Sequence, residues 1–236
     1  DSAVFRKVSE EGHKHGLIVS AHLPSNVVRT KDALDWGLDV IEHIFGAPND
    51  SLLIAQMVAQ GTMLDPTLVV FNNMLLFNDQ PDVYLNKDNY YVPDSVQKYW
   101  DSYRINAKWN DIKLNEQNLL SRQNTMEKYK NTTGILYRAG VTLLAGTDSP
   151  EPYCPPGFAL HDELVLLVES GLPPAAALKC ATLNNARALN QAKNLGSIEV
   201  GKIADMVILN ANPLSDIRNT RTINRVIHRG IVCDPK

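Results

Sequence analysis

Three apolar runs in this chain each end in a side chain that can bind a metal ion or carry a proton. The runs at 17–21 and 38–42 precede His22 and His43, and a third ends in Gly-Thr-Asp-Ser-Pro, which contains Asp148. Short apolar runs bounded by turn residues are typical of buried strands. A polar side chain at a strand end contributes little to packing, so we expect these three to meet at the mouth of a parallel barrel.

Helix signals alternate with these strands. We expect a first helix that ends at Gly12, a helix around Val27–Trp36, a helix over Ser51–Gln60 with Ser51 as N-cap and Gly61 behind it, and strands over Met63–Val70 and Val141–Thr147. Alternating helices and strands with short connections indicate parallel β-α units, and hence an α/β fold.

The region from about 71 to 132 interrupts this alternation. It is rich in Asn, Asp, Tyr and Lys, and we expect helices within Asp94–Asn106 and Asn115–Arg138. Its aromatic residues are Tyr99, Trp100, Tyr103 and Trp109. An insertion of this length covers an active site or binds a partner, unless its aromatic side chains simply pack its own helices.

The last part of the chain changes character after Asn190. Before it we expect helices over Leu160–Ser170 and Pro174–Asn190, and after it short strands at Ser197–Val200, Ala204–Leu209 and Arg225–Val232. These strands predict a small β element of about 45 residues that follows the barrel portion directly.

Composition excludes several classes of function. The net charge of −3 provides no basic field for nucleic acid, and no apolar run approaches the roughly 20 residues of a membrane helix. The three cysteines (Cys154, Cys180 and Cys233) form no CxxC pair, so neither a disulfide framework nor a thiolate metal site is indicated. We expect them to serve as packing residues.

The remaining histidines have less specific signals. His13 and His15 precede a strand, so we expect a surface feature at a helix end, at the opposite rim from His22. His161 has two interpretations of equal weight, a substrate or second-shell group at the mouth and a group that stabilises the next helix. We expect structural roles for His228 and for Asp205, which begins a strand.

Longer segments around these residues resemble a known family. They are SAH at 20–22, GLDVIEH at 37–43, TLLAGTDSP at 142–150, the helical run at 160–189 and LGSIEVGKIADMVILNANPLSDI at 195–217. Together they resemble the C-terminal part of the metal-dependent amidohydrolases, in the imidazolonepropionase-like and prolidase-like group. The resemblance is weakest in the 71–132 insertion.

The resemblance implies a fold and a domain division. Residues 1–190 would be part of an eight-stranded (β/α)8 TIM barrel, about strands five to eight, and residues 191–236 part of a small β-sandwich. It places His22 on the fifth strand, His43 on the sixth and Asp148 on the eighth. The family's HxH pair and bridging residue would lie upstream of Asp1, so we expect this chain to be the C-terminal portion of a longer protein.

The resemblance also implies a reaction, the hydrolysis of carbon–nitrogen bonds in cyclic amides or dipeptides rather than ordinary internal peptide bonds. His22, His43 and Asp148 would bind one or two divalent ions, with zinc expected. Asp148 would act as general base and then acid, and His43 would bind a second ion or orient the water and the carbonyl. The expected partner is a small-molecule substrate, with no nucleic acid and no membrane.

Two alternatives remain open. One is an incomplete, non-catalytic chain that lacks the HxH pair, and the other is a metal-dependent esterase or phosphotriesterase on the same scaffold. The sequence leaves open the substrate, the compartment (cytoplasmic or exported) and the oligomeric state, a homo-oligomer included.

Overall fold

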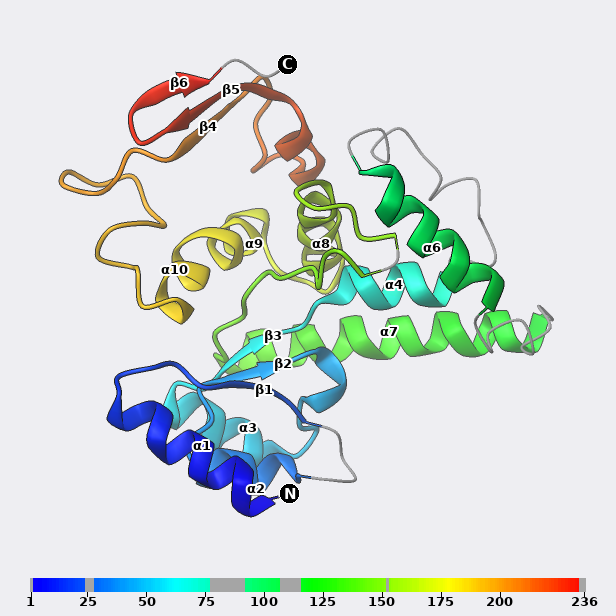
Figure 1. Ribbon diagram of the computed structural model, residues 1–236, viewed down its shortest axis with the longest axis vertical. Coiled ribbons are helices and arrows are strands. Elements are labelled where there is room, and N and C mark those ends of the chain that lie inside the picture. Colours follow the sequence, from blue (N-terminus) through cyan, green and yellow to red (C-terminus); the bar gives the residue numbers. More distant parts are fainter. Residues whose placement is uncertain (1, 24–27, 77–91, 107–115, 152, 234–236) are drawn as a thin grey trace.

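The chain forms a mixed α/β structure with one parallel and one antiparallel sheet (Figure 1). This computed structural model describes residues 2–23, 28–76, 92–106, 116–151 and 153–233. Helices α1 to α3 gather beside the parallel sheet, and the antiparallel sheet lies at the opposite end of the molecule (Figure 1).

The parallel sheet consists of three short strands in sequence order. They are β1 (Ser20–His22), β2 (Val40–Glu42) and β3 (Met63–Asp65). The register pairs His22 with Glu42 and Glu42 with Asp65, so the last residues of the three strands form one row at the carboxyl edge. The α/β class with a parallel sheet is therefore confirmed, while the closed barrel of a longer protein stays a prediction.

The segment expected as a strand over Val141–Thr147 makes only one isolated parallel bridge, between Leu64 and Leu143. Leu64 donates its N–H to Thr142 O at 3.0 Å, and Leu144 donates its N–H to Leu64 O at 2.8 Å. The prediction is wrong about the extent of regular pairing, although the segment lies beside β3 as a fourth strand would.

Side-chain amides cover the other edge of this segment. Asn184 Nδ2 donates to Leu143 O at 2.9 Å. Asn185 accepts from Ala145 N at 3.2 Å and donates to Ala145 O at 3.0 Å. The two asparagines satisfy backbone groups that a neighbouring strand would otherwise pair. They belong to the π-helical turn Cys180–Asn184 and the helix that follows it.

Nine α-helices are described in these residue ranges. They are α1 (Ser2–Lys14), α2 (Thr30–Asp35), α3 (Ser51–Gln60), α4 (Leu68–Leu76), α6 (Asp94–Asn106), α7 (Glu116–Ala139), α8 (Phe158–Glu169), α9 (Pro174–Lys179) and α10 (Asn185–Ala188). Gly12 lies inside α1 and does not end it, and residue 27 of the expected second helix lies outside the described residues. No helix in the described ranges is long and apolar enough to cross a membrane.

The expected strand Met63–Val70 is wrong beyond Asp65. Pro66 cannot donate a hydrogen bond to a neighbouring strand, and Thr67 has a left-handed φ of 45°. Helix α4 then begins at Leu68. The error has a simple cause, because a short apolar run does not distinguish a buried strand from a buried helix.

The core lies between the sheet and its helices. Ile41 in β2 and Leu64 in β3 are fully buried, and Met57 of α3 and Leu136 of α7 belong to the same hydrophobic cluster. Strands that are buried on both faces are typical of parallel sheets covered by helices. Helix α3 packs against α2 and α7, and α7 against α8.

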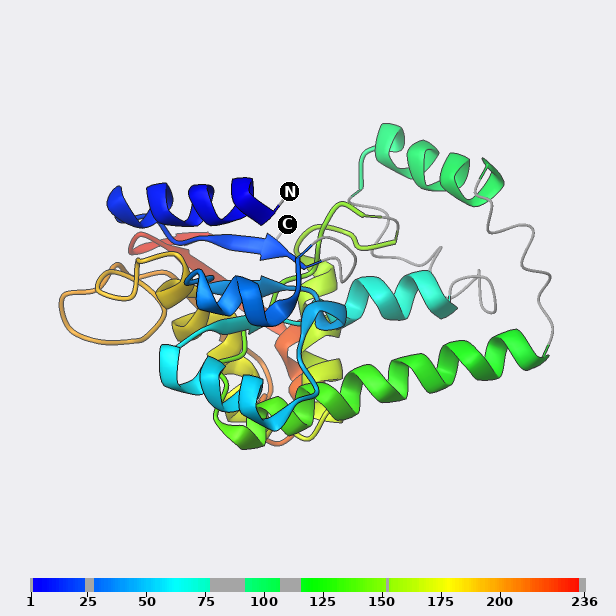
Figure 2. The same cartoon turned by 90° about the horizontal axis from the view of Figure 1, so that it is seen from below.

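The helices α4, α6 and α7 form one side of the molecule. Figure 2 shows α4 and α7 side by side, with α6 on the opposite side of α4 from α7. Helix α6 has the bounds of the expected range, and α7 matches the expected Asn115–Arg138 helix from Glu116 onward. Trp109 and Asn115 lie outside the described residues.

The C-terminal part forms the antiparallel sheet of β4 (Met206–Leu209), β5 (Ile223–His228) and β6 (Ile231–Cys233). The expected strand Ser197–Val200 is wrong, since the structure describes all four residues and places none of them in a strand. A small β element is thus present, while its place in a β-sandwich and the domain boundary near 190 stay predictions.

Helix α3 supplies a test of N-capping. The expected N-cap was Ser51, but the structure has Asp50 as N-cap, which accepts hydrogen bonds from Leu52 N and Leu53 N. We predict that Asp50→Ala lowers the free energy of unfolding by about 1 kcal/mol, because these donors lose their acceptor. Ser51→Ala, the control, should change it by a few tenths of that amount. Urea titrations measure both, and equal losses would contradict the assignment.

Candidate active site

The three residues singled out in the sequence come together at the carboxyl edge of the parallel sheet. His43 Nε2 lies 2.8 Å from His22 Nε2 and 3.9 Å from Asp148 Oδ2. The two imidazole rings meet edge to face, with centroids 4.2 Å apart. Three segments far apart in sequence therefore bring two imidazoles and a carboxylate to one place, and this cluster of His22, His43 and Asp148 is the candidate active site.

The backbone at two of these positions is strained. His43 has φ 66° and Asp148 has φ 54°, a region that residues with a Cβ seldom adopt. His43 leaves β2 here and precedes the 3-10 helix Ile44–Gly46. Strain of this kind costs about 1–3 kcal/mol and is concentrated at functional sites, where the surrounding structure holds it.

His43 sits in a buried aromatic environment. Its exposed fraction is 4%, and its ring stacks on Phe45 at 5.3 Å and meets Phe71 edge-on at 5.7 Å. Burial lowers the pKa of His43, and the nearby His22 lowers it further, against the opposing effect of Asp148. The imidazole is thereby kept neutral, which is the form that binds metal ions.

Thr67 fixes the orientation of the His43 ring. Its Oγ1 lies 2.6 Å from His43 Nδ1. Where Nδ1 donates to this hydroxyl, Nε2 is left free to face His22 and Asp148. The left-handed turn at Thr67, just after β3, is what brings the hydroxyl to the ring.

Asp65 is a further carboxylate of the site that sequence reasoning missed. It ends β3 in the same row as His22, and its Oδ1 accepts a hydrogen bond from Gly146 N at 2.8 Å. Burial, followed by the charge of Glu42, raises the pKa of Asp65 to about 7, although the N–H groups of Gly146 and Thr67 oppose this rise. Asp65 has the same sequence pattern as His22, because it also ends an apolar run. It was missed because the expected strand continued beyond it to Val70.

Gly146 is required for this approach. A Cβ atom at this position would lie 1.9 Å from Asp65 Oδ2, closer than any real contact. The absence of a side chain lets the segment that carries Asp148 lie directly against the end of β3.

Glu163 on α8 supports the site through the start of α4, a role that no pattern in the sequence indicated. Its side chain is completely buried on α8 and accepts a hydrogen bond from Val69 N at 2.7 Å, at the start of α4. Burial raises the pKa of Glu163 to about 8, with the opposing effect of the Val69 N–H. The carboxyl group thus holds the beginning of α4, which directly follows Thr67.

The donor set fits a divalent metal by its chemistry. Imidazole nitrogen and carboxylate oxygen are ligands that zinc accepts. The nitrogens His22 Nε2 and His43 Nε2 lie 2.8 Å apart, which is a hydrogen-bond distance. Two nitrogen ligands of a tetrahedral zinc ion lie about 3.3 Å apart, so the two rings would separate slightly to bind the same ion. Within the described ranges, no three His, Cys, Asp or Glu side chains are arranged to hold a metal ion.

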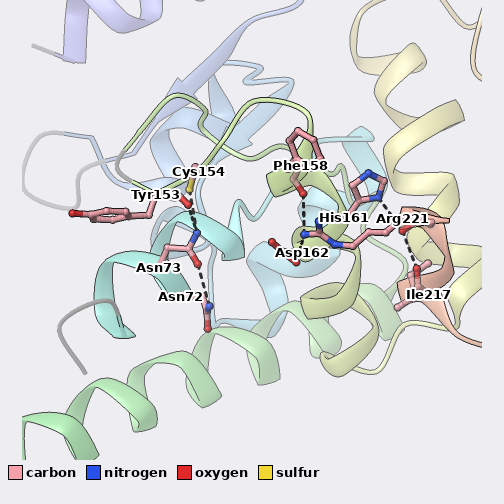
Figure 3. Close-up of polar contacts among 10 residues, drawn as sticks. Asn72, Asn73, Tyr153, Cys154, Phe158, His161, Asp162, Ile217 and Arg221 are labelled. Atoms are coloured by element: carbon pink, nitrogen blue, oxygen red, sulfur yellow. Dashed lines mark hydrogen bonds and ion pairs between the residues drawn. The ribbon is translucent and has the colours of Figure 1, made fainter. Parts of the chain in front are cut away.

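His161 lies at a contact between α8 and the C-terminal part. Its Nδ1 is 3.0 Å from Thr220 Oγ1, and Figure 3 shows the ring beside the segment that carries Ile217 and Arg221. This contact joins α8 to the C-terminal part and tests neither expected role of His161, so both stay predictions.

The other residues follow the sequence analysis with one exception. His13 lies in the last turn of α1, and its Nε2 is 2.8 Å from Asp39 Oδ2, just before β2, so it occupies the opposite rim from His22. Burial raises the pKa of Cys154 and of Cys180 to about 12, which keeps both as neutral packing residues. Cys233 is exposed, so its expected packing role is wrong.

An α/β protein with ionisable side chains at the carboxyl ends of its parallel strands has the arrangement of an α/β enzyme. Residues 2–232 match the amidohydrolase family, and the chain belongs to this family. The imidazolonepropionase-like and prolidase-like group expected from the sequence is supported by the relatives found.

Two curated relatives and one solved structure illustrate the likeness. An imidazolonepropionase from Geobacillus sp. (strain WCH70) is 38% identical over 88 residues, 35% of this chain and 19% of the relative. An ochratoxinase from Aspergillus niger is 37% identical over 93 residues, 39% of this chain and 18% of the relative. An Xaa-Pro dipeptidase crystallised with bound methionine has a TM-score of 0.70 at 22% identity and covers all of this chain, which spans 49% of that structure.

The buried carboxyl groups predict a dependence of stability on pH. An ordinary Glu releases its proton near pH 4.3 when unfolded, whereas folded Glu163 keeps it until about pH 8, so the free energy of unfolding falls as the pH rises between these values. Glu163→Gln removes this contribution. We predict a smaller fall in melting temperature between pH 5 and pH 9 for the variant, by differential scanning calorimetry. Glu169→Gln, on the exposed end of α8, is the control, and parallel curves for Glu163→Gln and the unsubstituted protein would contradict the prediction.

Proposed function

We propose that the protein containing this chain is a metal-dependent hydrolase of carbon–nitrogen bonds in small cyclic-amide or dipeptide-type substrates. The observation that most supports this proposal is the position of His43 Nε2, which faces both His22 Nε2 and Asp148 Oδ2. Membership of the amidohydrolase family supports the reaction class, and the names of the relatives support cyclic and amide substrates.

His22 and His43 are the residues that would hold the ion, with Asp148 beside them. A bound divalent ion supplies a water molecule that ionises near neutral pH and an acid that polarises the substrate carbonyl. The neutral state of His43 and its contact with Thr67 suit this role, because a protonated imidazole cannot bind a cation.

Asp148 is the proposed general base and then acid. Its side chain is 41% exposed, so a substrate in solution can reach it. It takes the proton from the attacking water and returns it to the leaving nitrogen, which must be protonated before the carbon–nitrogen bond breaks. Phe45 and Phe71 pack against the His43 ring and give this side of the site an apolar wall.

The test uses the protein that contains this chain, purified with Zn²⁺. It is assayed with an imidazolone propionate, an ochratoxin and a series of Xaa-Pro dipeptides, and the loss of each substrate and the appearance of its hydrolysis product are measured. We predict turnover of at least one compound and a loss of kcat of about 10²-fold or more for Asp148→Asn, because the amide cannot accept the proton. The control is Asp162→Asn. Asp162 lies on α8 and forms an ion pair with Arg221 away from the site, so this variant should keep near-native turnover.

Other outcomes would favour the alternatives. Turnover of 4-nitrophenyl acetate or of a 4-nitrophenyl phosphotriester, with none of the amides, would replace the proposal by an esterase or phosphotriesterase. No turnover of any compound together with no binding of Zn²⁺ would favour a non-catalytic protein. Near-normal turnover in Asp148→Asn would remove Asp148 from the mechanism.

A further inference from the structure

The loop that carries Asp148 contains two strained residues. Asp148 has φ 54° and Tyr153 has φ 65°, and both are non-glycine residues in the left-handed region. Such conformations persist only where neighbouring groups hold them. The contacts of residues 148–151, 153 and 154 therefore show which parts of the molecule set the position of the Asp148 carboxylate.

Contacts within the loop close it on itself. Glu151 N donates to Asp148 O at 2.9 Å, and Ser149 Oγ donates to Cys154 O at 2.9 Å. Thr147 Oγ1 lies 2.9 Å from Ser149 Oγ. These bonds give the loop its shape, but they do not attach it to the rest of the molecule.

Helix α4 attaches the far end of the loop. Asn73 is buried, and its Nδ2 donates to Tyr153 O at 2.7 Å and lies 3.6 Å from Cys154 Sγ (Figure 3). This contact fixes the backbone at the second strained residue, five positions after Asp148.

Helix α6 attaches the middle of the loop through Trp100. The indole Nε1 donates to Pro150 O at 3.0 Å, two residues after Asp148. In return, the Tyr153 hydroxyl donates to Trp100 O at 3.2 Å, and the two rings have centroids 5.6 Å apart. Trp100 is 1% exposed, and Val92 and Tyr153 are buried with it.

These contacts differ from ordinary packing within the insertion. The Trp100 side chain donates outside its own helix, and the group it binds belongs to the Asp148 loop. The two hydrogen bonds run in opposite directions between α6 and the loop, so they resist both translation and rotation of one against the other. A buried indole N–H usually has a partner, and here the partner is a loop carbonyl.

We propose that Trp100 and Tyr153 are positioning residues that hold the Asp148 carboxylate in its working orientation, so that helix α6 of the insertion belongs to the catalytic apparatus. The proposal rests on the proposed function of Asp148. In this proposal α6 aligns the residue that transfers the proton, a role separate from covering the site. A small displacement of such a group is enough to lower the rate of a proton transfer.

The experiment removes each hydrogen bond and keeps the ring. Trp100→Phe deletes the indole N–H, and Tyr153→Phe deletes the hydroxyl, both in the protein that contains this chain. We expect kcat to fall by about tenfold in each variant with KM within about twofold, because substrate binding is untouched. Amide hydrogen exchange in residues 148–154, measured by mass spectrometry, should become about tenfold faster, and the dissociation constant for Zn²⁺ should rise.

Tyr99→Phe is the matched control, since Tyr99 precedes Trp100 on α6 and is half exposed. It should leave kcat and the exchange of residues 148–154 unchanged. Unchanged exchange in Trp100→Phe and Tyr153→Phe would overturn the proposal whatever the turnover. Faster exchange with unchanged kcat would also overturn it, because the contacts would then serve packing alone.

Failure of the proposed function gives a different result. In that case the unsubstituted protein turns over none of the amide substrates, and the variants are judged by loop exchange and Zn²⁺ affinity. Faster exchange with weaker Zn²⁺ binding would still support the positioning of Asp148 by α6, and faster exchange with unchanged Zn²⁺ binding would overturn it.

Discussion

Hydrogen bonding between the parallel strands determines where the polar groups of the candidate site lie. The register places His22, Glu42 and Asp65 in one row, and each neighbouring group depends on that row. His43 follows β2 immediately, and its N–H donates to Asp65 O at 2.9 Å. A shift of one residue would turn each side chain to the other face of the sheet, so the site and the core share a single register.

Electrostatics around this row are arranged to keep buried groups neutral. Burial raises the pKa values of Asp65 and Glu163 and lowers that of His43, so in all three groups it favours the uncharged form. The Asp148 carboxylate, by contrast, is half exposed to solvent.

The sequence predicted the convergence of His22, His43 and Asp148, because residues that end parallel strands meet at one edge whatever their separation along the chain. It missed Asp65, since the apolar residues after Pro66 form a buried helix where a continued strand was expected. It could not predict the role of Glu163, whose backbone partner Val69 is 94 positions away and carries no side-chain signal. Local patterns predict strand ends and helix bounds, whereas contacts to backbone groups require the folded chain.

The asparagine pair at the end of the helical run has a consequence for association between molecules. Asn184 and Asn185 bind the backbone of Leu143 and Ala145 as a neighbouring strand would. Exposed strand edges recruit edges of other molecules and lead to intermolecular β-structure. Because two amide side chains already bind Leu143 O and both backbone groups of Ala145, these groups are not available to a strand of another molecule, and this stretch of edge is covered without a proline or a charge.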